Sequence, residues 1–313
     1  MVRSPLALAA LATVAVPGLD AFDVRRPAQP GADYDTAVVI DAHRSRWVVR
    51  APQHAAAGAA LEAEVVLLAM LAEEAQRGRL PFAVPAPVGF AHLPEGGRAA
   101  VHAEIPGDAL RLDRLAPGPG LAAALGRAIA AVHELPPAIV ENAGLPAYDA
   151  GEYRQRRQAE VDEAARTGKV PPALLRRWEE RLEDVALWRF RPTVVHGDLT
   201  ADRVLVRGES VTGLLHWGDA CVADPADDLA WLLVAAHPDV TDSIMEAYQL
   251  RRTELTDPHL TERALLAGEL ALARWLLYGV RSQDAEIVAD AVAMLEDLDA
   301  HTREDADAEP LLA

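Results

Sequence analysis

The residues best suited to chemistry in this sequence are His196 and Asp198, which stand in a His-Gly-Asp run. The run lies between the apolar segments Thr193–Val195 and Val204–Val206, which predict strands on either side of a loop. A carboxylate fixed on such a loop can accept the proton of a hydroxyl group. Asp198 is therefore the candidate catalytic residue, with a turn-capping carboxylate as the alternative. His196 is expected to hold the loop by hydrogen bonds.

Arg203 occupies the position that decides whether this loop could hold a metal ion. In phosphoryl-transfer loops of the kinase type, an Asn five residues after the catalytic Asp binds Mg²⁺. A guanidinium has no acceptor lone pair and stays positively charged, so Arg203 cannot coordinate a cation. Two interpretations stay open. Arg203 pairs with Asp198 and leaves the site idle, or it reaches a nucleotide phosphate and partly replaces the charge of the metal.

His216 stands where the same template places a second metal-binding Asp. Mg²⁺ prefers carboxylate oxygen, whereas imidazole suits Zn²⁺, Mn²⁺ and other transition metals better. The simpler interpretation is a partly buried His that is bonded within its own loop. Asp219, three residues further on, and Asp202, next to Arg203, are possible substitute ligands. The candidate metal ligands are thus Asp219 and His216.

Arg50 ends an apolar segment and is a candidate for binding the phosphates of a nucleotide, because a guanidinium grips phosphate through two hydrogen bonds. Glu64 lies on the following predicted helix, where it could form an ion pair with Arg50. The alternative is an exposed Arg and a solvated Glu. Gly31–Asp35 takes the place of a phosphate-covering loop with a single glycine. Val101–Ala103 would be the hinge that receives a nucleobase, or an ordinary strand end.

Other polar residues of the second half are assigned to structure. Asp224, Asp227 and Asp228 are expected to cap and anchor the helix that follows them. His133 lies on one face of a predicted helix and is assigned to core packing rather than to ligation.

These candidates need a small sheet with one helix in the first hundred residues. Alternating apolar residues over 36–50 predict an antiparallel hairpin. An apolar stripe then predicts a helix over Ala55–Gln76. Two further strands are expected at 88–90 and 99–104, on either side of a Gly-rich turn.

Helices predominate in the rest of the chain, interrupted by the strands around the His-Gly-Asp run. The predicted helices are 121–135, 150–166, 172–188 and a series from Asp227 to about Asp297. The predicted strands are 193–195, 204–206 and 211–216. Residues 303–313 are acidic and have no apolar periodicity, which predicts a disordered tail.

At this point the chain resembles the aminoglycoside phosphotransferase family. The resemblance lies in His196-Gly-Asp-Leu199, Leu214-Leu-His-Trp-Gly-Asp219 and Asp224-Pro-Ala-Asp-Asp-Leu-Ala230. Trp47-Val-Val-Arg-Ala-Pro52 and the Ala-rich composition are most similar to the macrolide 2′-phosphotransferase branch. The resemblance covers about residues 20 to 300.

The resemblance implies an α+β, two-lobed protein-kinase-like fold, with a small sheet-plus-helix lobe before a larger, mostly helical lobe. Residues 1–104 would form the N-terminal nucleotide-binding lobe, with an N-terminal helix. Residues 105–302 would form the C-terminal catalytic and substrate lobe, and 303–313 the tail.

Composition limits the classes of molecule that the protein could bind and the compartment that it suits. The net charge of −18 over 313 residues argues against nucleic acid, which needs basic surface. The single cysteine, Cys221, excludes an internal disulfide and fits a reducing cytoplasm. The apolar stretch Leu6–Val16 follows Arg3 as in a signal peptide, but without a clear cleavage site it predicts a helix docked on the domain. No stretch is expected to span a membrane.

The sequence therefore predicts a nucleoside-triphosphate-dependent phosphotransferase that acts on a hydroxyl of a macrolide- or aminoglycoside-like small molecule. Asp198 would be the base, and Arg50, Glu64 and Arg203 would bind ATP or GTP. A Mg²⁺ or Mn²⁺ ion, if used, would be held unusually. The alternative is a catalytically impaired pseudo-kinase that binds a nucleotide or small ligand, since loss of both usual metal ligands should cost on the order of 10³-fold in rate.

Overall fold

A five-stranded antiparallel sheet builds the N-terminal part of the computed structural model, which describes residues 2–26, 33–254 and 257–308. The strand order is β1-β2-β3-β5-β4, and every neighbouring pair is antiparallel. The strands are β1 (Ala21–Arg25), β2 (Tyr34–Asp41), β3 (Arg46–Pro52), β4 (Gly89–His92) and β5 (Arg98–Ala103). The predicted hairpin and the two later strands are confirmed, and β1 is an addition.

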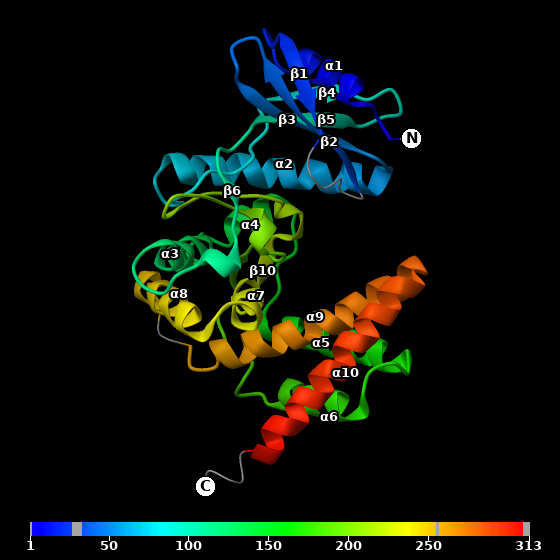
Figure 1. Cartoon of the computed structure of the whole chain (residues 1–313), viewed down its shortest axis with the longest axis vertical. Coiled ribbons are helices and arrows are strands. Elements are labelled where there is room, and N and C mark those ends of the chain that lie inside the picture. Colours follow the sequence, from blue (N-terminus) through cyan, green and yellow to red (C-terminus); the bar gives the residue numbers. More distant parts are fainter. Residues whose placement is uncertain (1, 27–32, 255–256, 309–313) are drawn as a thin grey trace.

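Helices α1 (Pro5–Ala15) and α2 (Ala55–Gln76) lie on this sheet (Figure 1). Leu8 and Ala12 of α1 are buried in an apolar cluster with Val49 and Val101 of the strands. The expected docked helix is therefore confirmed. Helix α2 has the predicted bounds and lies between the sheet and the helical part of the chain (Figure 1).

Helix α2 also corrects the expectation that no stretch is long enough to span a membrane. By length and composition alone, it is the one helix in the described ranges that could do so. Its Leu67, Leu68 and Leu71 are buried in the main core, together with residues of the helical part. These apolar residues therefore join the two parts of the fold.

The C-terminal part is mostly helical (Figure 1). Its helices are α3 (Leu121–His133), α4 (Ala138–Asn142), α5 (Ala150–Arg166), α6 (Pro172–Glu183), α7 (Asp227–Ala235), α8 (Pro238–Arg251), α9 (Leu260–Ser282) and α10 (Ala285–Ala308). Helix α6 ends before the predicted Trp188, because Asp184 adopts an extended backbone and its carboxylate accepts the N–H of Ala186.

The predicted disordered tail is wrong for its first residues, because α10 continues to Ala308. Arg303 forms an ion pair with Asp299 at 2.6 Å, one turn earlier, which favours the helix although its apolar periodicity has ended. Residues 309–313 lie outside the described residues.

Two small sheets flank the His-Gly-Asp loop. Strand β7 (Thr193–Val195), which leads into the loop, pairs with β10 (Cys221–Ala223). Strand β8 (Val204–Arg207), which follows the loop, lies between β6 (Asp108–Ala109) and β9 (Ser210–Leu214). The predicted strands are thus confirmed, although the last ends at Leu214, because His216 adopts a left-handed backbone with φ of 63°. The chain has the predicted α+β, two-lobed architecture.

Close approach of α3 and α8 makes Gly126 sensitive to substitution. A Cβ atom at this residue would lie 2.1 Å from the carbonyl oxygen of Ile244. We expect Gly126→Ala to lower the free energy of unfolding by about 1–3 kcal/mol in urea denaturation, because the two helices must separate. Gly58→Ala is the matched control: its Cβ would meet only Pro52, at 3.8 Å, so the same measurement should show equal or slightly higher stability. Equal stability of Gly126→Ala and the parent protein would contradict this packing.

Candidate functional site

The loop that carries Asp198 is fixed by Asp228, at the start of α7. The backbone N–H of His196 donates to Asp228 Oδ2 at 2.7 Å, and that of Gly197 donates to Oδ1 at 2.9 Å. Gly197 has φ of 83°, and a Cβ atom there would lie 2.2 Å from the carbonyl oxygen of Asp219. Only glycine fits at this point of the loop.

A buried polar network supports Asp228 from behind. His133 Nε2 lies 3.2 Å from Asp228 Oδ2, and His133 Nδ1 lies 2.8 Å from the Tyr248 hydroxyl. Burial raises the pKa of Asp228, but the hydrogen bonds from the His133 side chain and from the His196 backbone hold this pKa below its usual value. Burial lowers the pKa of His133. We infer an ionised Asp228 that accepts hydrogen bonds from three residues.

The expected cap of α7 is confirmed only for Asp224, whose Oδ1 accepts the backbone N–H of Ala226, the residue before the helix, at 3.0 Å. Asp228 holds the loop, whereas Asp224 pairs with the buried Arg263, with its Oδ2 2.6 Å from Arg263 Nε. Asp227 accepts from Arg157 Nη2 at 3.0 Å. Each carboxylate has a buried partner from elsewhere in the chain, and local spacing cannot reveal such a partner.

His196 holds the loop from its other side. Its ring is fully buried, with Nε2 2.8 Å from the carbonyl oxygen of Leu215 and with the Trp217 ring centroid at 4.7 Å. Burial lowers the pKa of His196, so its ring is neutral and Nε2 donates. This arrangement agrees with the loop-holding role expected for His196.

Arg203 lies directly on Asp198. Its Nη1 donates to the backbone carbonyl of Asp198 at 2.5 Å and also forms an ion pair with the carboxylate. The Asp198 side chain is 41% exposed and the Arg203 side chain 23% exposed. Of the two interpretations, the structure contains the pair.

Arg50 and Glu64 form the ion pair that the sequence suggested, with Arg50 Nη1 2.9 Å from Glu64 Oε2. The Arg50 guanidinium also lies over the Tyr34 ring, 4.4 Å from its centroid. Glu64 is buried and accepts the backbone N–H of Trp217 at 3.2 Å. It therefore ties β3 and α2 to the segment that follows His216.

His216 is exposed but surrounded by charge. The surrounding protein, and next the positive charges of Arg50 and Arg203, lower the pKa of His216 to about 4, so its ring is neutral at pH 7. Asp219 is exposed, and Asp202 accepts from the Thr200 hydroxyl at 2.6 Å.

These donors do not fit a Mg²⁺ site of the kinase kind. Arg203 offers only N–H donors and His216 offers imidazole nitrogen, whereas an amide oxygen and a carboxylate hold Mg²⁺ in the kinase template. Moreover, no group of three or more His, Cys, Asp or Glu that could hold a metal occurs in residues 2–26, 33–254 and 257–308. Metal ligation by Asp219 or His216 stays a prediction.

The expected hinge, Val101–Ala103, is the end of the buried strand β5. His102 is 6% exposed, with Nδ1 2.8 Å from the carbonyl oxygen of Ala103. Burial lowers the pKa of His102 to about 4. Gly31, the only glycine of the expected phosphate-covering loop, lies outside the described residues.

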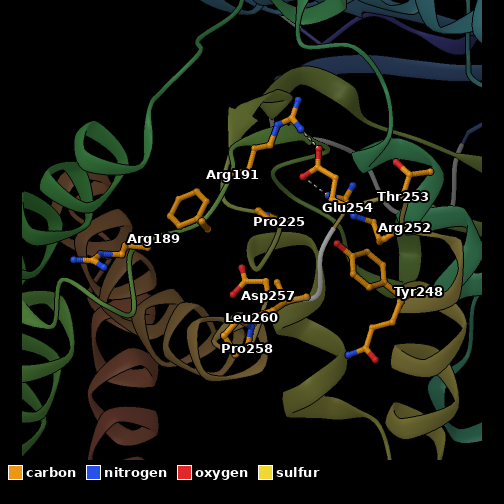
Figure 2. Close-up of a pocket in the computed structure, with 12 residues that line it drawn as sticks. Arg189, Arg191, Pro225, Tyr248, Arg252, Thr253, Glu254, Asp257, Pro258 and Leu260 are labelled. Carbon is orange, nitrogen blue, oxygen red and sulfur yellow. Dashed lines mark ion pairs between the residues drawn. The ribbon is translucent and has the colours of Figure 1, made fainter.

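A cavity of about 610 Å³ lies elsewhere, between the segment 189–191, the end of α8 and the start of α9 (Figure 2). Arg191 and Arg252 both pair with Glu254 beside it. None of the predicted site residues lines this cavity, so it is separate from the Asp198 loop.

Comparison with known proteins shows the family to which the chain belongs. Residues 24–266 match the model of the phosphotransferase enzyme family, APH. The chain belongs to this family. A further relative is the uncharacterized protein YcbJ of Bacillus subtilis (strain 168), 23% identical over 223 residues, which span 70% of this chain and 73% of YcbJ.

Solved structures of the same fold include two macrolide phosphotransferases. Macrolide 2′-phosphotransferase MphH from Brachybacterium faecium is 24% identical, with a TM-score of 0.79 and coverage of 93% of this chain and 98% of MphH. Macrolide 2′-phosphotransferase type I is 27% identical, with a TM-score of 0.78 and coverage of 94% and 98%. The GDP complex of an aminoglycoside 2′-phosphotransferase-IIIa is 20% identical, with a TM-score of 0.77 and coverage of 96% and 100%. The family fold is thus present nearly throughout the chain.

Substitution of Asp228, the α7 residue that holds the loop, should lower the stability of the protein strongly. We expect Asp228→Asn to cost about 2–4 kcal/mol of unfolding free energy, because an amide cannot replace a buried carboxylate that accepts from His196, Gly197 and His133. Urea denaturation measures this loss, and Asp242→Asn on the exposed side of α8 is the control. A loss no larger than that of the control would refute the anchoring role.

The stability of the protein should fall on acidification partly through His102. Its pKa is about 4 in the folded state and near 6.5 when unfolded, so the unfolded chain binds more protons between these values. His102 should therefore contribute a loss of up to about 1.4 kcal/mol per pH unit as pH falls below 6.5. Urea titrations at pH 7 and 5 should show a smaller loss for His102→Asn than for exposed His92→Asn. Identical losses would contradict this assignment.

Proposed function

We propose that this protein is a nucleoside-triphosphate-dependent phosphotransferase that phosphorylates a hydroxyl group of a small molecule. The observation that carries the proposal is the carboxylate of Asp198, which is partly exposed on a loop fixed by Asp228 and His196. A hydroxyl acceptor needs a base in a fixed position, and this loop supplies one. Family membership supports the same reaction class.

The reaction would proceed by in-line displacement. The acceptor oxygen forms a bond to the terminal phosphorus of ATP or GTP, and the bond from that phosphorus to its bridging oxygen breaks. The nucleoside diphosphate leaves with the bonding electron pair, and Asp198 takes the hydroxyl proton.

Arg203 must release the Asp198 carboxylate before this carboxylate can act as a base. A guanidinium on the carboxylate occupies the oxygen that would accept the proton and blocks access of the hydroxyl. The phosphates of a nucleotide offer Arg203 an alternative anionic partner. Arrival of the nucleotide would thus prepare the base.

Arg50 is proposed to bind the phosphates of the nucleotide, and Glu64 to orient it. The Glu64 ion pair and the Tyr34 ring fix the Arg50 guanidinium from two directions. A group held in this way loses little freedom when it binds phosphate. Because the usual divalent-cation donors do not fit here, no step of the reaction is assigned to a metal ion.

A macrolide- or aminoglycoside-like acceptor is proposed. Among the solved structures of this fold, two are macrolide 2′-phosphotransferases, and another is a complex with GDP and kanamycin. The net charge of −18 suits a cationic acceptor and disfavours nucleic acid. The unpaired Cys221 and the use of nucleoside triphosphates suit the cytoplasm.

Asp198→Asn tests the proposal. The amide keeps the shape of the side chain but cannot take a proton, so phosphorylation should fall by about 10²–10⁴-fold. The assay follows transfer of labelled terminal phosphate from ATP and GTP to a panel of macrolides and aminoglycosides. Asp162→Asn, exposed on α5, is the control and should retain activity. Asp198-independent transfer, or none from the parent protein to any acceptor, would reject the proposal.

A second candidate is a catalytically impaired binding protein with the same nucleotide site. The ion pair between Arg203 and Asp198 favours it, because this pair occupies the base. In that case a nucleotide would raise the melting temperature of the protein while no acceptor became phosphorylated. Turnover by the parent protein would exclude this candidate.

A further inference from the structure

We propose that this site binds the polyphosphate of its nucleotide as a metal-free anion, with Arg203, Arg50 and His216 in place of a divalent cation. The inference rests on the proposed nucleotide site and states how that site recognises its ligand. It follows from the chemistry of the donors, their charge and their arrangement.

The two positions that would hold a cation present hydrogen-bond donors. A metal site needs oxygen lone pairs, whereas Arg203 has N–H groups only. The imidazole of His216 carries an N–H, and this exposed ring has no hydrogen-bonding partner among the described residues. Phosphate oxygens are acceptors and match such groups directly. The side chains at both positions therefore suit the phosphate anion rather than the cation that would neutralise it.

The change preserves the local charge. An amide, a carboxylate and a single Mg²⁺ sum to one net positive charge, which is also the charge of the Arg203 guanidinium. The phosphates would therefore meet a similar field without a metal. A Mg²⁺ ion added to Arg203 would instead experience like-charge repulsion.

The backbone holds these groups next to each other. Val204 pairs with Leu214 in the β8–β9 hairpin, and the N–H of Leu215 donates to the carbonyl oxygen of Arg203 at 2.9 Å. This bond fixes the residue just before His216 against Arg203. The positions that would have shared a cation are therefore joined by a direct contact of the main chain.

Arg50 completes the set from the sheet. Within the described ranges, its hydrogen bond and ion pair with Glu64 both use Nη1, so Nε and Nη2 keep donors for phosphate. Glu64 also accepts the N–H of Trp217, which places Arg50 on the same side of the fold as His216.

The Asp198 carboxylate balances Arg203 until the nucleotide arrives. Arg203 is only 23% exposed, so its charge needs a partner in the free protein. A planar guanidinium can exchange the carboxylate for phosphate oxygens and keep its bond to the Asp198 carbonyl.

Isothermal titration with ATP, GTP and inorganic tripolyphosphate, each in EDTA and in excess MgCl₂, tests the inference. The parent protein should bind at least one nucleotide and tripolyphosphate in EDTA as tightly as in MgCl₂, or more tightly. Binding at least tenfold tighter with Mg²⁺ would overturn the inference and leave the proposed function intact. Absence of nucleotide binding in both buffers would overturn both.

Single variants test whether the loss of a hydrogen-bond donor weakens binding without unfolding the protein. Arg203→Ala should weaken metal-free binding by about tenfold or more, because a charge-assisted hydrogen bond is lost. Arg207→Ala, exposed on strand β8, which begins directly after Arg203, is the matched control and should bind like the parent. Equal binding by the two variants would reject the role of Arg203. Melting temperatures without ligand confirm that both variants fold.

The double variant Arg203→Asn/His216→Asp reverses the change of donors. It offers an amide oxygen and a carboxylate again, so nucleotide binding should become dependent on Mg²⁺, by about tenfold or more. Metal-free binding that persists unchanged in this variant would show that other residues hold the phosphates and would overturn the inference.

Discussion

The hydrogen bonds from the His-Gly-Asp loop to the buried Asp228 are the constraint on which the site depends. The buried backbone N–H of His196 would be unsatisfied without that carboxylate, and the N–H of the exposed Gly197 donates to the same group. His133 and Tyr248 extend the network to α3 and α8. The position of Asp198 is thus set by the packing of α3, α7 and α8, and the loop needs no ligand to hold its shape.

A second constraint, the buried carboxylate of Glu64, joins the sheet to this helical part. It pairs with Arg50 and accepts from the backbone N–H of Trp217, the residue after His216. Neither contact involves the His216 side chain. The coupling between the two parts of the fold is therefore independent of the side chain at 216.

The sequence predicted most of the secondary structure, because apolar periodicity is local information. Helices α2 and α5 have the expected bounds, and Arg50 and Glu64 form the suggested pair. The role of Asp228 was not predicted, since its partners are more than thirty residues away and a carboxylate before a helix also resembles a cap. The continuation of α10 beyond Arg303 was not predicted, because the helix extends past the end of its apolar stripe. The ion pair between Arg303 and Asp299 favours the helix there.

The position of the His-Gly-Asp loop is therefore independent of which side chains stand at 203 and 216. The carboxylate of Asp228 and the ring of His196 hold the loop, and neither contact uses a side chain at 203 or 216. The chemistry at these two positions is set by their side chains alone, and here both are nitrogen donors. In the proposed function, Asp198 as the base and Arg50 as the phosphate-binding group are both positioned by contacts within the fold, without a cation. Arg203, rather than Asp198, is thus the residue whose partner decides what the site does.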